Sequence, residues 1–166
     1  MATLYYNFNV IGHEWDMGPA CANPSINPAP ATVPCIYIIH NSNSNETYVG
    51  YAFNARHRWR TRTEAFHCFG IEEDYAQNIL CAYCIPCDQH GNQYQGVFQG
   101  ANSPEHLLIR AVRNGVLGVT TCTNTQMREL PCIPPNGIDQ LEIHLPAPNW
   151  GGLLGDRYVD IHGFAL

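Results

Sequence analysis

The chain has 166 residues, of which 45% are apolar and 13% are charged. This length suits one domain with a single core, and the composition excludes collagen and intrinsically disordered chains. No uncharged apolar run approaches the roughly 20 residues of a membrane span. The first residues also lack the basic and apolar regions of a secretory signal. We therefore expect a soluble protein that contacts no membrane and is either cytoplasmic or delivered into a target cell by a non-classical route.

Charge is distributed unevenly along the chain. The net charge of −6 argues against a protein that coats nucleic acid by bulk attraction. Half of the eight cationic side chains lie within seven residues, and all eight are arginines, whose planar fork matches phosphate. This segment is therefore the candidate contact for a phosphate backbone. Its cations are Arg56, Arg58, Arg60 and Arg62.

The first part of the chain predicts a β-hairpin behind an extended arm. TLYYNFNVI near the start is a candidate strand, and the Pro-, Ala- and Asn-rich residues up to 34 predict an arm. The β-rich runs at 35–40 and 47–53 are separated by NSNSNE, a stretch of small polar residues suited to a loop. We expect these two runs to form an antiparallel hairpin.

Two further elements are expected after the hairpin. Apolar residues spaced by three or four predict a helix over about 55–66, in the arginine-rich segment. NILCAYCI at 78–85 is β-rich and is followed by Pro86, which should end a strand.

The best-delimited helix lies in SPEHLLIRAVRNG. Ser103 suits the N-cap, Pro104 the first helical position, and Gly115 the residue after the last turn. Another β-rich run follows at 119–125, and the Pro- and Gly-rich tail at 126–166 is expected to wrap the core.

The predicted order is strand, strand, helix, strand, helix. In this frame CIY at 35–37, YVG at 48–50 and the following NARHRWRTR resemble the signature of the GIY-YIG nuclease family. The resemblance covers 35–125. It implies an α+β fold, with a small antiparallel three-stranded sheet flanked by helices in the family's β-β-α-β-α order, and irregular extensions at 1–34 and 126–166 of a single domain.

The resemblance also implies a metal-dependent endonuclease. By match to the family, Tyr37 is the candidate general base, Tyr48 assists it, and Glu105 holds Mg²⁺ or Mn²⁺. A hard carboxylate oxygen with several waters is how Mg²⁺ is usually bound. Glu105 would also complement the helix dipole in the first turn without binding any metal.

The resemblance to the GIY-YIG family also implies roles for the arginines. Arg58 would clamp the scissile phosphate, because a bidentate guanidinium suits it. Arg56, Arg60, Arg62 and His57 are expected to contact the nucleic-acid backbone. A solvated basic helix is the alternative interpretation of the whole segment.

Three positions depart from the family pattern or stay open. Cys35 stands where the motif begins with glycine, and Arg62 stands where many members carry a histidine. The late asparagine that steadies the site in the family matches Asn124 or Asn114, and we prefer Asn124.

Eight cysteines are many for this length, and without a secretory signal we expect reduced thiols or metal ligands. Cys81, Cys84, Cys87 and His90 recur at spacings of three. On a strand Cys81 and Cys84 face opposite sides, so the candidate structural zinc ligands are Cys84, Cys87 and His90. We favour the alternative of buried or free thiols.

The sequence thus predicts a divalent-metal-dependent endonuclease that acts on DNA. Restriction, mobile-element and delivered-toxin roles stay open, and the Pro-rich ends are candidates for target selection or homodimerisation. The alternative is a cysteine-rich, zinc-binding interaction module without catalysis, in which the hairpin is only scaffold.

Overall fold

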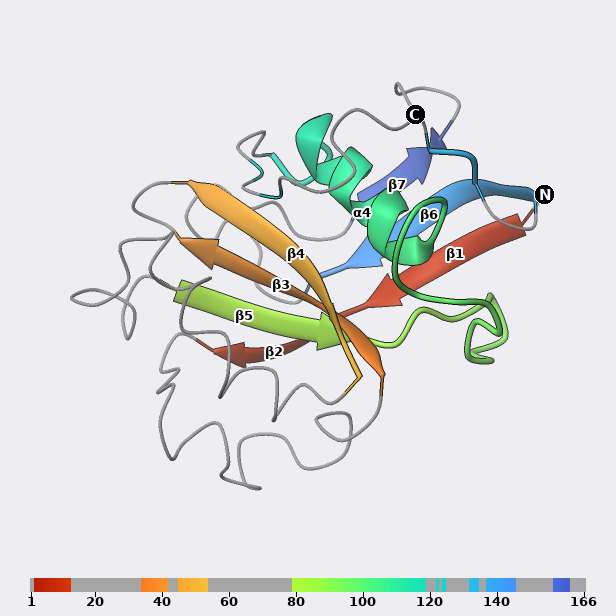
Figure 1. Cartoon of the computed structure of the whole chain (residues 1–166), viewed down its shortest axis with the longest axis horizontal. Helices are drawn as coiled ribbons and strands as arrows, with labels where there is room; N and C mark the ends of the chain where they lie inside the picture. Colours follow the sequence, from red (N-terminus) through yellow and green to blue (C-terminus); the bar gives the residue numbers. More distant parts are fainter. Residues whose placement is uncertain are drawn as a thin grey trace.

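The computed structural model describes residues 2–12, 34–41, 45–53, 79–118, 122, 124, 132–134, 137–145 and 157–161. These residues form two β-sheets and one α-helix (Figure 1). The architecture is therefore mixed α and β, as expected. The predicted helix over 55–66 lies outside the described residues, and so does most of the β-rich run at 119–125.

The four-stranded sheet contains the predicted hairpin. Its strands are β2 (Asn9–Gly12), β5 (Ile79–Cys84), β3 (Cys35–Asn41) and β4 (Glu46–Ala52), in the order β2-β5-β3-β4. All neighbouring pairs are antiparallel. The predicted hairpin and the predicted strand at 78–85 are both confirmed, and β3 lies between β4 and β5.

A second sheet joins the two ends of the chain. It contains β1 (Ala2–Asn7), β6 (Ile138–His144) and β7 (Arg157–Asp160), with β1 parallel to β6 and β6 antiparallel to β7. The expectation of irregular ends is wrong for these residues. The predicted strand TLYYNFNVI is divided at Phe8, so that β1 and β2 belong to different sheets.

The helix α4 (Pro104–Arg113) begins where the sequence predicts. Ser103 accepts a hydrogen bond from the His106 N–H at 3.3 Å, and Pro104 follows at the first helical position. Asn114 is the C-cap, and Gly115 has a φ of +79°, a left-handed conformation that glycine adopts without strain. Eight of the ten helical residues are buried. No helix in the described part of the chain is long and apolar enough to cross a membrane.

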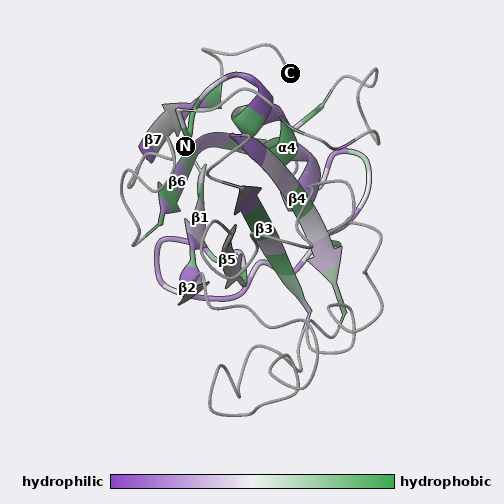
Figure 2. Cartoon of the chain, turned by 90° about the vertical axis from the view of Figure 1, so that its left-hand side faces the viewer, coloured by the Kyte–Doolittle hydropathy of each residue, from purple (hydrophilic) through white to green (hydrophobic). Residues whose placement is uncertain are grey.

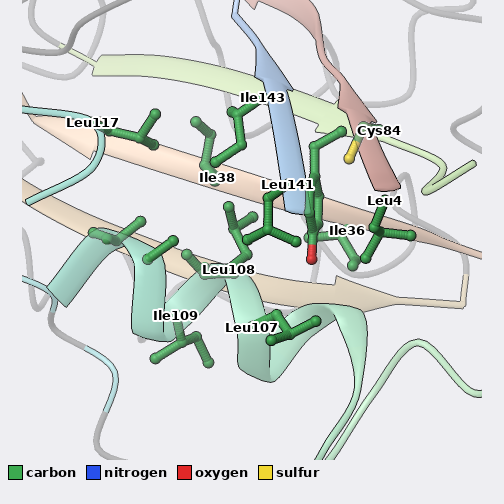
Figure 3. Packing of buried hydrophobic residues seen from close by; sticks show 14 of the residues in the cluster. Leu4, Ile36, Ile38, Cys84, Leu107, Leu108, Ile109, Leu117, Leu141 and Ile143 are labelled. Atoms are coloured by element: carbon green, nitrogen blue, oxygen red, sulfur yellow. The ribbon is translucent and has the colours of Figure 1, made fainter. Parts of the chain in front are cut away.

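Both sheets and α4 share one hydrophobic core. Ile36 and Ile38 of β3 lie toward Leu108 of α4, and Leu141 and Ile143 of β6 belong to the same cluster (Figure 3). Figure 2 shows β3 as a largely hydrophobic strand beside a more mixed β4. Because side chains alternate along a strand, Tyr37 lies on the other face of the four-stranded sheet, away from α4.

Candidate functional site

Tyr37 and Tyr48 lie together on the sheet face opposite α4. Tyr37 is paired with Gly50 and Tyr48 with Ile39, and paired residues of antiparallel strands share a face. The two ring centroids are 6.2 Å apart and the rings are tilted by 35°. Tyr37 is only 2% exposed, whereas Tyr48 is half-buried. The structure therefore brings together the two tyrosines singled out in the sequence, and Tyr48 is the more accessible.

Gly50 makes room for the Tyr37 ring. A Cβ atom at this position would collide with Cζ and Oη of Tyr37, and its distance to Cε1 would be 2.8 Å. Any larger residue must therefore displace a ring that is itself almost fully buried. The glycine of the YVG stretch has a packing reason that is independent of any catalytic role.

Asn124 forms hydrogen bonds with strand β4 of the hairpin. Its Oδ1 accepts the N–H of Val49 at 2.9 Å, and its Nδ2 donates to the carbonyl oxygen of Val49 at 2.7 Å. A buried side-chain amide thus pairs with β4 as a neighbouring strand would. Asn114, the other asparagine considered for this position, is exposed and donates to the Arg110 carbonyl at the end of α4, at 2.8 Å.

Glu105 lies in the first turn of α4 and is 4% exposed. Its Oε2 accepts the N–H of Gly100 at 3.1 Å, and its own N–H donates to the Phe98 carbonyl at 3.0 Å. The carboxylate therefore holds the loop that leads into the helix. Since α4 packs on the face of Ile36 and Ile38, the structure does not bring Glu105 together with the two tyrosines.

In the described part of the chain, the Glu105 carboxylate serves as a hydrogen-bond acceptor for the loop before α4. Within the described ranges there is no group of three or more His, Cys, Asp or Glu side chains that could hold a metal. A divalent ion at this place would share a nearly buried carboxylate with the Gly100 N–H. Glu105 is better explained here as a structural acceptor.

The three candidate zinc ligands differ in how far they are exposed to solvent. Cys84 is fully buried in the shared core, whereas His90 is exposed on a turn. Cys87 lies between them and accepts a hydrogen bond from Asn7 Nδ2 at 3.5 Å. Burial raises the pKa of the Cys84 thiol well above its usual value and also raises the pKa of Cys87.

The remaining candidates lie outside the described residues. They are Arg56, His57, Arg58, Arg60 and Arg62, which follow the end of β4.

Two buried histidine contacts were missed in the sequence. His40 Nδ1 and Thr47 Oγ1 are 2.9 Å apart, and both residues are fully buried at paired positions of the hairpin. His106 Nδ1 accepts the N–H of Asn102 at 3.0 Å. The hairpin register would have revealed the first contact, because it places positions 40 and 47 opposite each other. The second depends on the turn before α4, where Asn102 has a φ of +57°.

Searches of protein-family models, of curated proteins and of solved structures each return no match for this chain.

Proposed function

We propose that the chain is an endonuclease that hydrolyses phosphodiester bonds of DNA, with its site on the tyrosine face of the four-stranded sheet. The observation that carries the proposal is the Tyr37–Tyr48 pair on the β3–β4 hairpin, packed over Gly50. The resemblance of this hairpin to the GIY-YIG motifs supplies the reaction class.

The two tyrosines have different parts in this proposal. Tyr48 is the more accessible phenol and would contact the substrate, where its phenolate form would take a proton from the attacking water. As the bond from this water to phosphorus forms, the bond to the leaving oxygen breaks, and that oxygen takes up a proton from solvent. Tyr37 is enclosed between Tyr48 and Gly50 and acts as a positioning residue. Arg58 would neutralise charge that develops on the phosphoryl oxygens.

Plasmid nicking tests the proposal. Supercoiled DNA is incubated with the whole chain in EDTA, Mg²⁺ or Mn²⁺, and Tyr48→Phe and Arg58→Ala are compared with the wild type. Each substitution is expected to lower the nicking rate by about 100-fold or more. Tyr51→Phe is the matched control, since Tyr51 lies on the same strand but on the core side, against Phe98. Wild-type levels of nicking in both variants, or no nicking by the wild type in any buffer, would refute the proposal.

The same assay separates two roles of Glu105. A glutamine keeps an oxygen that can accept the Gly100 N–H but is a poor ligand for Mg²⁺. If Glu105 only holds the loop, Glu105→Gln retains most of the activity, and this is the outcome we expect. Loss of activity in a folded Glu105→Gln protein would instead favour the metal-ligand role that the family resemblance implies.

One observation favours a non-catalytic interaction module as the second candidate. Glu105 and the tyrosines lie on different sides of the sheet, so three of the groups expected to converge do not surround one phosphate. This candidate predicts no nicking at any metal concentration. Stoichiometric zinc in the purified protein would be needed to support its zinc-binding form.

A further inference from the structure

A cavity of about 270 Å³ opens beside β1. One side is formed by Ala2, Thr3 and Leu4 of β1, with Ile138 of β6 adjoining them, and the other side by the turn that contains Asp88. We call this cavity the β1 groove. It lies between the three-stranded sheet and the loop after β5, and its lining residues take no part in the proposed nuclease site.

The backbone of β1 is open along this groove. Tyr5 forms two backbone hydrogen bonds with Cys87, from the Tyr5 N–H at 2.9 Å and to its carbonyl at 3.1 Å. Thr3 is two residues earlier on the same strand and faces the same edge as Tyr5. Among the residues that the structure describes, none pairs its backbone with Thr3 on that edge. Backbone pairing is therefore formed at Tyr5 and, within the described residues, is not continued at Thr3.

Asp88 explains why the chain turns away from β1 directly after Cys87 has paired with Tyr5. Its Oδ1 accepts the N–H groups of His90 at 2.8 Å and Asn92 at 2.9 Å, and Gly91 has a φ of +81°. The carboxylate thus nucleates a tight turn. Figure 1 shows the chain after β5 passing beside β1 before it turns.

Asp88 also sets the charge of the groove. It is the only charged side chain among the described residues that line the cavity, and the others are apolar or neutral polar. Hydrogen bonds from Asn92 and His90 lower the pKa of Asp88, so it is a carboxylate at neutral pH. The groove therefore favours a cationic occupant.

We propose that the β1 groove binds the first residues of an extended peptide, which pairs with Thr3 and places its free α-ammonium group against Asp88. The direction of the bound peptide follows from the pairing already present, because Cys87 forms an antiparallel bridge with Tyr5. A guest strand that continues this line begins beside Asp88 and runs toward Ala2. Addition of a strand to an open sheet edge is a recurring mode of peptide recognition.

Titration of the whole chain with the peptide Val-Thr-Val-amide tests the proposal. Its β-branched residues favour an extended backbone. Binding is followed by calorimetry and by the NMR shift of the Thr3 amide, with the acetylated peptide as the comparison. We expect the free amine to bind about 5-fold more tightly than the acetylated form. This difference should vanish in Asp88→Asn and persist in Asp160→Asn, which removes an exposed carboxylate on β7 away from the groove.

A second pair of variants tests the backbone contact. Thr3→Pro removes the outward N–H at an edge position where proline is tolerated, whereas Thr3→Ala keeps it. We expect Thr3→Pro to lose binding and Thr3→Ala to retain it. Equal affinity of the acetylated and free peptides, equal binding by the proline and alanine variants, or no binding of either peptide at millimolar concentration would overturn the proposal. None of these outcomes bears on nicking, so the proposed function is tested separately.

Discussion

The two sheets of this protein are built from different kinds of sequence relationship. In the four-stranded sheet, β3 and β4 follow each other closely along the chain, and Asn41 pairs with Glu46. In the three-stranded sheet, Ala2 pairs with Ile138, so the partners come from opposite ends of the chain. The β3–β4 hairpin can be read from local patterns, whereas the β1–β6 pairing depends on the closure of a very long loop. The comparison also teaches that the two sheets are not independent, because they share one core.

The largest expected effect comes from the residues that join the sheets. Leu141→Ala in β6 and Ile38→Ala in β3 each remove a fully buried side chain from the shared core. Each should lower the free energy of unfolding by about 2–5 kcal/mol. Chemical denaturation followed by tryptophan fluorescence and by far-UV circular dichroism is the measurement. Both variants should still show one transition with coincident probes, and a separate transition for either sheet would break the comparison.

A smaller effect is expected on the tyrosine face. Gly50→Ala introduces a Cβ atom into the Tyr37 ring and should destabilise the protein by about 1–3 kcal/mol. The same substitution made in a Tyr37→Leu background should have a smaller effect, because the ring is then absent. Thermal unfolding of the four proteins gives the coupling. If the two substitutions are additive, the ring contact is not what requires glycine.

The buried hydrogen bonds of Asn124 to β4 can be compared with the exposed one of Asn114. Asn124→Ala leaves the Val49 N–H and carbonyl without their side-chain partner in a buried place, and should cost about 2 kcal/mol. Asn114→Ala removes one exposed hydrogen bond at the end of α4 and should cost about 1 kcal/mol or less. Urea unfolding measures both. Equal losses would mean that the β4 edge is satisfied without Asn124.

A gradual loss of stability is expected in alkali. Burial raises the pKa of Cys35 from 9.0 to about 12 and that of Cys132 to about 11. Their neutral thiols therefore stabilise the fold fully below pH 9, and this stability is lost as the pH rises from about 9 toward 12. For the deeply buried Cys35 the loss should be about 1.4 kcal/mol per pH unit in that range.

Cys35→Ala tests the assignment. Its unfolding free energy between pH 9 and 11 should fall less steeply than that of the wild type, by the share of one thiol. An unchanged slope would mean that Cys35 ionises as readily in the folded as in the unfolded chain.

Local sequence patterns were sufficient for the hairpin, for β5 and for α4. β-rich runs on both sides of a small polar stretch indicate the hairpin, and Ser103, Pro104 and Gly115 delimit the helix because caps and turns are short-range structures. The two tyrosines on one face follow from the hairpin register alone. In the sequence, Tyr37 and Tyr48 were singled out together only by the resemblance to the GIY-YIG motifs, and the register that places them side by side is seen in the structure.

Only the tertiary structure decided which element covers which face. The sequence places Glu105 at the start of a helix, but nothing local shows that α4 packs against Ile36 and Ile38, away from Tyr37. The parallel pairing of β1 with β6 is equally hidden, because neither strand carries a turn signal that points to the other. Periodicity defines an element and its two faces over a few residues. The partner of each face is chosen by burial of apolar surface across the whole chain.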